Sequence, residues 1–172
     1  MRAPVVLIGL MGSGKTSVGK ELARHLGLPW MDLDRELERR HKRSVALQFE
    51  LDGEPLFRRR ERALLARLVA AGPGVISAGG GVVLDPANRA LLRRCVTVYL
   101  QASASALAGR LKGPQALRRP LLRGGKVESA LRRLARRRGP LYRSCAACTV
   151  RASQGSAVEV ARRVAWKLRG LA

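Results

Sequence analysis

Residues 9–16 read Gly9-Leu-Met-Gly-Ser-Gly-Lys-Thr16 and match the phosphate-binding pattern G-x-x-x-x-G-K-[ST]. An apolar run, Val5–Ile8, precedes the motif, and a helical pattern with Val18 and Leu22 on its apolar face follows it. A strand, a glycine-rich turn and a helix are the context in which this motif binds phosphates. The stretch therefore predicts a nucleotide-binding loop, or P-loop, after the first strand of an α/β fold.

The residues of this loop have distinct expected roles. The glycines allow backbone N–H groups to converge on phosphate oxygens, and the N-terminus of the helix adds its positive dipole. Lys15 is expected to reach the β- and γ-phosphates of ATP, and the Thr16 hydroxyl to ligate Mg²⁺. The expected ATP-binding residues of the loop are Gly12, Ser13, Gly14, Lys15, Thr16 and Ser17. The motif indicates the nucleotide but not the acceptor of its phosphoryl group.

Short apolar runs alternate with helical patterns along the chain, which is typical of an α/β fold with a parallel sheet. Strands are predicted at residues 5–8, 29–32, 75–78, 96–100 and 147–151. Helices are predicted at residues 17–26, 34–43, 45–51, 103–110 and 127–138, and from 157 onward. A longer helix is predicted to open with Asp52-Gly-Glu-Pro55 and to end at Gly72-Pro-Gly. Residues 112–126 contain three glycines, two prolines and five basic groups, which predicts a mobile loop. No repeat and no change of composition marks a second domain, so we expect one domain over residues 1–172.

The chain is strongly basic, with 34 Lys and Arg against 12 Asp and Glu and a formal net charge of +22. Nucleic acid, a nucleotide and an acidic metabolite are all anions that this charge attracts, and solvated surface arginines are the alternative explanation. Two Trp, two Tyr and two Phe offer few stacking platforms, which argues against nucleic acid as a partner.

The expected location is the cytoplasm. The N-terminal apolar run is too short for a signal peptide or a membrane span, so we expect no membrane partner. Three cysteines form no disulfide framework, which fits a reducing compartment. Cys145 and Cys148 supply two thiols where a structural zinc ion needs four ligands, so we expect no zinc site there.

Two of the four features that concern the acceptor are charged pairs. Asp32 and Asp34 stand two residues apart at the end of a predicted strand, where they would point to the same side. Alternatively, Asp34 is the N-cap of the next helix. Arg58 and Glu61 are three residues apart on a helix, so Glu61 can hold a guanidinium that binds a carboxylate. The alternative for this pair is an ordinary surface ion pair.

The other two features are a glycine triplet and two arginine motifs. Gly79-Gly-Gly81 follows a predicted strand and lets the backbone approach an anion, although such a triplet alone is usually a turn. Further along the chain come Arg119-Pro-Leu-Leu122 and Arg138-Gly-Pro-Leu-Tyr142.

In their order and spacing these features resemble the shikimate kinase family, over essentially the whole chain. The resemblance implies a five-stranded parallel sheet of order 2-3-1-4-5, flanked by helices, with a lid at about residues 112–126. It implies ATP-dependent phosphorylation of the 3-hydroxyl of shikimate, in the pathway to chorismate and the aromatic amino acids, with Mg²⁺. A kinase of the same fold that acts on gluconate or a nucleoside monophosphate, and a nucleic-acid-binding P-loop protein, are the alternatives.

The resemblance also implies the roles of individual residues. Thr16 and, through water, Asp32 would hold Mg²⁺. Asp34 would contact the acceptor hydroxyl as a base or an orienting group, while Lys15 and the lid residue Arg119 would act on the transferring phosphoryl group. The expected shikimate-binding residues are Asp34, Arg58, Glu61, Gly80, Gly81 and Arg138.

One departure from the family pattern concerns the adenine. The family commonly has an arginine that packs on adenine shortly after the last strand, and the matching position here is Gly155. Arg110, just before the lid, is then expected to stack on the base, and Arg119 to contact ATP from the lid. We expect a monomer whose partners are ATP and shikimate.

Overall fold

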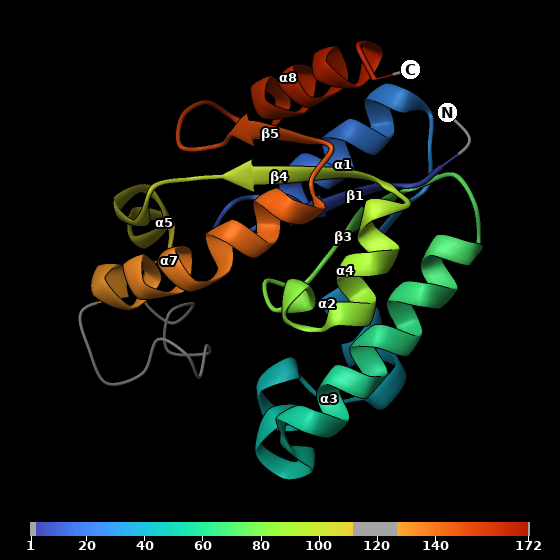
Figure 1. Cartoon of the computed structure of the whole chain (residues 1–172), viewed down its shortest axis with the longest axis vertical. Helices are drawn as coiled ribbons and strands as arrows, with labels where there is room; N and C mark the ends of the chain where they lie inside the picture. The colour runs from blue at the N-terminus through green and yellow to red at the C-terminus, as the bar shows by residue number, and fades with distance from the viewer. Residues whose placement is uncertain (1–2, 112–126, 172) are drawn as a thin grey trace.

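The computed structural model describes residues 3–111 and 127–171, which form a five-stranded parallel sheet with helices on both faces (Figure 1). The strands are β1 (Val5–Ile8), β2 (Trp30–Asp32), β3 (Val75–Ser77), β4 (Val96–Gln101) and β5 (Cys148–Arg151). Their order in the sheet is β2-β3-β1-β4-β5, and the paired strands run parallel. This order confirms the one implied by the resemblance.

Helices alternate with the strands, as the hydrophobic periodicity predicted. Their bounds are α1 (Lys15–Leu26), α2 (Leu33–His41), α3 (Val45–Ala70), α4 (Pro86–Arg93), α5 (Ala104–Arg110), α7 (Val127–Cys145) and α8 (Ala157–Arg169), with a short 3₁₀ helix η1 (Val82–Leu84). The predicted loop at 112–126, with Arg119, lies outside the described residues.

The core has two layers because alternate strand residues point to opposite faces of the sheet. Val5 and Leu7 of β1 face α1 and α8, in a cluster that includes Leu22 and Val164. The neighbouring residues Val6 and Ile8 face the other layer, which α2, α3, α4, α5 and α7 cover. All four residues of β1 are fully buried, as expected for the central strand of a parallel sheet covered on both faces.

The two helices predicted before and after Asp52 are present, and they follow one another within α3 across a kink at Gly53, where φ is 76°. The structure differs from the predicted elements in two other places. Helix α7 does not end at residue 138 but continues through Pro140 to Cys145, because Arg138 and Tyr142 on either side of the proline both bond the carbonyl of Gly80. Residues 82–93 were assigned no element, yet they form η1 and α4, which Asp85 caps.

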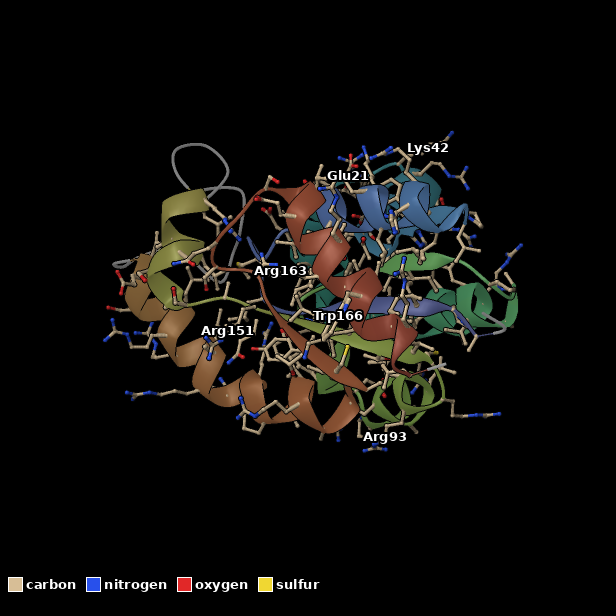
Figure 2. The ribbon with its side chains drawn as sticks, turned by 90° about the horizontal axis from the view of Figure 1, so that it is seen from above. Glu21, Lys42, Arg93, Arg151, Arg163 and Trp166 are labelled. Carbon is tan, nitrogen blue, oxygen red and sulfur yellow. The ribbon has the colours of Figure 1, made fainter. Side chains whose placement is uncertain are left out.

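Basic side chains project from many elements in the view from above, including Lys42, Arg93, Arg151 and Arg163 (Figure 2). Glu21 is paired with a basic neighbour, since its carboxylate accepts from Arg24 at 2.9 Å. Over residues 3–111 and 127–171, no helix combines the length and the apolar character needed to cross a membrane.

Helix α1 packs very closely against the sheet at Gly19. Ser77 at the end of β3 accepts from Trp30 Nε1 at 3.1 Å and donates to the carbonyl of Lys15 at 2.8 Å. These bonds join β2, β3 and the first turn of α1, and they leave no room for a side chain at Gly19. An added Cβ there would collide with Ser77 Oγ and lie 2.7 Å from Trp30 Nε1.

We therefore expect Gly19→Ala to lower the free energy of unfolding by about 1–3 kcal/mol, as overpacking of a dense core does. The control is Gly109→Ala in α5, where a Cβ would meet no atom within 4 Å. That variant should be neutral or more stable by about 0.5–1 kcal/mol, because alanine favours a helix over glycine. Urea unfolding of both variants provides the comparison, and equal stabilities would contradict the close approach at Gly19.

Candidate functional site

The candidate site lies at the carboxyl ends of β1, β2 and β3, where the loops that follow parallel strands meet. The P-loop follows β1, and Gly79–Gly81 follows β3. The two backbones lie close together, since a Cβ added to Gly80 would be 3.5 Å from both the Gly9 carbonyl oxygen and the Met11 nitrogen. The fold thus brings the predicted phosphate loop and the predicted glycine triplet together.

The P-loop has a backbone that requires glycine. Gly12 and Gly14 have φ angles of 78° and 89°, in the left-handed region that other residues rarely adopt. Helix α1 begins directly after Gly14, so its N-terminus points into the loop. Lys15 Nζ donates to the carbonyls of Gly9 and Leu10 at 2.9 Å each, which keeps the ammonium group over the loop.

Two hydroxyl residues complete the loop. The buried Ser13 hydroxyl has no hydrogen-bond partner among the described residues. A phosphate oxygen would satisfy such a group, since buried hydroxyls normally find a partner. Ser17, also predicted to bind ATP, is exposed in the first turn of α1.

Thr16 and Asp32 form the part of the site that suits a magnesium ion. The Thr16 hydroxyl donates to Asp32 Oδ2 at 2.7 Å, so two oxygen ligands of the kind that Mg²⁺ prefers lie side by side. The described residues contain no cluster of three or more His, Cys, Asp or Glu side chains that could hold a metal. A pair of oxygen ligands next to a phosphate loop fits Mg²⁺, which binds through few protein groups plus phosphates and water.

The position of Asp34 differs from both sequence interpretations. The chain turns into α2 at Leu33, so Asp32 and Asp34 do not lie on one extended segment. Asp32 is the N-cap of α2, because its Oδ1 accepts from the backbone N–H of Arg35 at 3.2 Å. The alternative role of Asp34 as the N-cap is therefore wrong. Asp34 lies in the first turn of α2 instead.

The Asp34 and Glu61 carboxylates both lie against Gly79. A Cβ on this glycine would be 2.7 Å from Asp34 Oδ1 and 2.8 Å from Glu61 Oε1. Glu61 is almost fully buried, and burial raises the pKa of its carboxyl to about 7. The Arg58 and Arg138 guanidinium groups oppose this rise in the pKa, while the Asp34 carboxylate adds to it.

The Arg58 guanidinium is held by two carboxylates, as the sequence predicted for one of them. Its Nη1 donates to Glu61 Oε2 at 2.7 Å, and its Nε and Nη2 donate to Glu54 Oε1 at 3.1 and 3.0 Å. The guanidinium also packs against the Gly81 backbone, where a Cβ would collide with it. Arg58 and Glu61 are both largely buried, so their contact is not the ordinary surface ion pair of the alternative interpretation.

Arg138 reaches the glycine triplet from α7, on the other side of the site. Its Nη1 donates to the Gly80 carbonyl at 3.0 Å, and the Tyr142 hydroxyl donates to the same oxygen. Tyr142 also stacks on Tyr99 of β4, with ring centroids 5.0 Å apart, and burial raises the pKa of its hydroxyl. No sequence pattern predicts these roles of Tyr142 and Glu54, although Tyr142 stands in the same motif as Arg138.

Among the described residues, Arg110 is the predicted site residue that lies away from the acceptor groups. Arg110 donates to the carbonyls of Gly12 at 3.3 Å and Ser153 at 3.2 Å, so it links the P-loop to the loop between β5 and α8. Arg119 falls in 112–126, outside the described residues.

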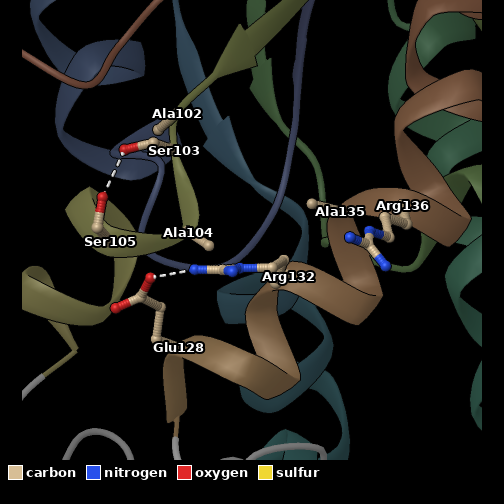
Figure 3. Close-up of a pocket in the computed structure, with 8 residues that line it drawn as sticks. All are labelled: Ala102, Ser103, Ala104, Ser105, Glu128, Arg132, Ala135 and Arg136. Carbon is tan, nitrogen blue, oxygen red and sulfur yellow. Dashed lines mark hydrogen bonds and ion pairs between the residues drawn. The ribbon is translucent and has the colours of Figure 1, made fainter.

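A hollow of about 440 Å³ lies between the start of α5 and helix α7 (Figure 3). Arg132 donates to Glu128 at 2.7 Å on one wall, and the hydroxyls of Ser103 and Ser105 are 3.1 Å apart on the other. None of the predicted site residues that the structure describes lines this hollow. The candidate site is therefore the strand-end cluster and not this hollow.

Comparison with known proteins matches the chain to shikimate kinases. A sequence model of the family "Shikimate kinase" matches residues 11–169. The chain is 40% identical to the shikimate kinase of Thiobacillus denitrificans over 168 residues, which cover 97% of this chain and 91% of that protein. It is 42% identical to the shikimate kinase of Symbiobacterium thermophilum, with 95% of each chain covered.

The fold gives the same result. The solved structure of shikimate kinase from Acinetobacter baumannii in complex with shikimate superimposes with a TM-score of 0.92 and 35% sequence identity. The match covers 98% of this chain and 93% of that one.

The raised pKa of Glu61 predicts how stability depends on pH. Between its ordinary pKa near 4.5 and about 7, the folded protein keeps the Glu61 proton that the unfolded chain has released. This stabilisation is complete below pH 4.5 and is lost as the pH rises through 7. From pH 5 to pH 8, the free energy of unfolding should therefore fall by on the order of 2 kcal/mol more in the wild type than in Glu61→Gln.

Urea unfolding of the ligand-free proteins at pH 5, 6.5 and 8 measures this difference. The glutamine keeps the shape and an acceptor oxygen for Arg58 but does not titrate, so it is the matched control. A difference in stability that stays constant with pH would show that Glu61 titrates at its ordinary pKa.

Proposed function

The chain belongs to the shikimate kinase family, and we propose that it transfers the γ-phosphoryl group of ATP to the 3-hydroxyl of shikimate. This reaction yields shikimate 3-phosphate and ADP, in the route to chorismate and the aromatic amino acids. The observation that carries the proposal is the close approach of the P-loop and the glycine triplet around Gly80, whose carbonyl also holds Arg138. A phosphate donor and a carboxylate-bearing acceptor can meet at this point.

The acceptor's carboxylate is bound by Arg58 and Arg138, which reach the triplet from α3 and α7. Guanidinium groups bind carboxylates through paired, charge-assisted hydrogen bonds. Glu61 keeps Arg58 in place, and the backbones of Gly80 and Gly81 contact the substrate. A nucleoside monophosphate has no carboxylate, so a kinase for it on this fold would not need two arginines that hold one from two sides. Gluconate does carry a carboxylate, so the comparison of acceptors below separates it from shikimate.

Asp34 orients the acceptor hydroxyl and accepts its proton as the new bond to phosphorus forms. The hydroxyl oxygen attacks the γ-phosphorus, the bond from that phosphorus to the bridging oxygen breaks, and ADP carries away the electron pair. Lys15 stabilises negative charge on the transferring group, since the reaction depends on positioning and electrostatics. Gly12 to Ser17 hold the phosphates of ATP, Arg110 contacts its base, and Arg119 contributes from the lid.

Thr16 and, through water, Asp32 would hold Mg²⁺ next to the phosphates. When bound, the ion neutralises phosphate charge during transfer. The Thr16–Asp32 hydrogen bond of 2.7 Å supports this assignment, because it fixes both oxygen ligands beside the loop.

The proposal further includes one kinase domain over residues 1–172, a lid at about 112–126, a monomeric state and a cytoplasmic location, without a membrane or nucleic acid partner.

Release of ADP in the presence of Mg²⁺ and ATP tests the function directly. Shikimate, gluconate and nucleoside monophosphates are offered in parallel as acceptors. We expect turnover with shikimate to exceed turnover with each of the others by at least a hundredfold. Turnover with another acceptor at a higher kcat/KM than with shikimate would overturn the proposal.

Arg58→Ala and Arg138→Ala should each raise the KM for shikimate by about ten- to a hundredfold. The reason is that a charge-assisted hydrogen bond contributes about 1.5–3 kcal/mol. The KM for ATP should change less than threefold. The matched control is Arg59→Ala, which removes an exposed arginine next to Arg58 and should change neither constant. Equal increases in both KM values would show that these arginines act through the fold or the lid.

Asp34→Asn should lower kcat by at least a hundredfold, because an amide cannot accept the hydroxyl proton. Stability should change little, since Asp32 and not Asp34 caps α2. Steady-state rates and thermal unfolding of the same preparation separate the two effects. A variant that keeps its kcat but loses stability would assign Asp34 a structural role instead.

A further inference from the structure

The base of a bound nucleotide must lie on one particular side of the P-loop. In the sheet order, β2 and β3 stand on one side of β1, and the acceptor groups Asp34, Arg58 and Gly79–Gly81 follow these strands or pack against their ends. A γ-phosphate that faces the acceptor leaves the base to extend the other way, over the ends of β4 and β5. Arg110 marks this side, because it bonds both Gly12 and Ser153.

The loop between β5 and α8 is firmly held on that side. Ser103 after β4 donates its backbone N–H to Ser153 Oγ at 3.1 Å. Ser156 and Glu159 form a capping box at the start of α8. Between these anchors Gly155 has a φ of 89°, a conformation that side chains other than glycine rarely adopt.

Arg163 of α8 occupies the space next to Gly155. Its Nη2 donates to the carbonyl of Gln154 at 2.7 Å, and the same nitrogen lies 3.1 Å from the position of a Cβ on Gly155. The side chain lies at the loop that leads into α8 (Figure 2). The loop and the helix together form a hollow of about 360 Å³, lined by Gln154, Gly155, Glu159, Arg162 and Arg163. The Arg163 guanidinium from α8 therefore lies beside Gly155, where the loop between β5 and α8 has no side chain of its own.

We propose that Arg163 binds the nucleobase of ATP, by stacking its guanidinium on the purine ring beside Gly155. The inference rests on the proposed function to the extent that ATP occupies the P-loop. The hydrogen bond to Gln154 fixes the guanidinium before the nucleotide arrives, so less conformational entropy is lost on binding. A guanidinium stacked on the face of a purine makes no hydrogen bond to the groups at its edge, which are what distinguish adenine from guanine. We therefore expect it to bind both bases with similar affinity.

Nucleotide binding without an acceptor tests this role independently of the kinase reaction. Calorimetry measures the Kd of MgATP, MgGTP and magnesium tripolyphosphate for the wild type, Arg163→Ala, Arg163→Lys and Arg169→Ala. We expect Arg163→Ala to raise the Kd of ATP and GTP by about three- to thirtyfold, the range of a cation–π contact. The Kd of tripolyphosphate, which has no base, should stay within twofold.

The other two variants separate stacking from charge and from loop bracing. Arg169→Ala removes an exposed charge from the same helix and should leave all three Kd values within twofold. Arg163→Lys keeps the charge and a donor for Gln154 but loses the planar group, so its Kd for ATP should remain at least threefold above that of the wild type.

Three results would overturn the role of Arg163. They are an unchanged Kd for ATP in Arg163→Ala, an equal rise in the Kd of tripolyphosphate, and full recovery in Arg163→Lys. If the expected Kd pattern appears but shikimate is not phosphorylated, the proposed function fails while the base contact stands.

Discussion

The close approach of backbone and side chains at Gly79–Gly81 is the constraint on which the acceptor site depends. Asp34 and Glu61 lie against the first glycine, the Arg58 guanidinium lies against the third, and the carbonyl of the second holds Arg138. Any side chain at the first or third position would push these groups apart. Because the triplet also lies close to the P-loop backbone, groups from α2, α3 and α7 meet at the phosphate-binding loop. The geometry thus depends on the absence of a side chain at Gly79 and at Gly81.

The carboxylates around Arg58 hold its guanidinium in place and contribute little to the stability of the fold. Burying an ion pair removes both groups from water, and this desolvation offsets much of their attraction. The rise of the Glu61 pKa to about 7 reflects that cost, since burial favours the neutral acid even beside a guanidinium. In a chain of net charge +22, repulsion from other basic side chains would favour other positions for Arg58. Glu54 and Glu61 instead hold it at Gly81.

The sequence predicted the elements with strong local signals. The P-loop, the five strands and the Arg58–Glu61 contact were predicted from motif, period and spacing, and they agree with the structure. The strand order needed the resemblance, because local periodicity carries no information on which strands pair. The sequence predicted an end of α7 at residue 138, before Pro140, because a proline disfavours a helix interior. The contacts of Arg138 and Tyr142 with Gly80, 60 positions before Pro140, are not visible in any local pattern. For the same reason no local pattern could show that Arg163 fills the space beside Gly155.

Under the proposed function, the partners of Arg58 also explain how its guanidinium could accept a carboxylate of the substrate. A guanidinium has five N–H donors, and three of them donate to Glu54 and Glu61 in the described part of the chain, so two remain for a further carboxylate. The two present partners differ in burial: Glu61 is 1% exposed and Glu54 is 55% exposed. An exposed ion pair contributes little because water competes for both charges, so the Glu54 contact can yield at small cost. The buried Glu61 contact remains and keeps the guanidinium at Gly81. In the proposed site, a substrate carboxylate would therefore meet an arginine that the buried Glu61 has already oriented.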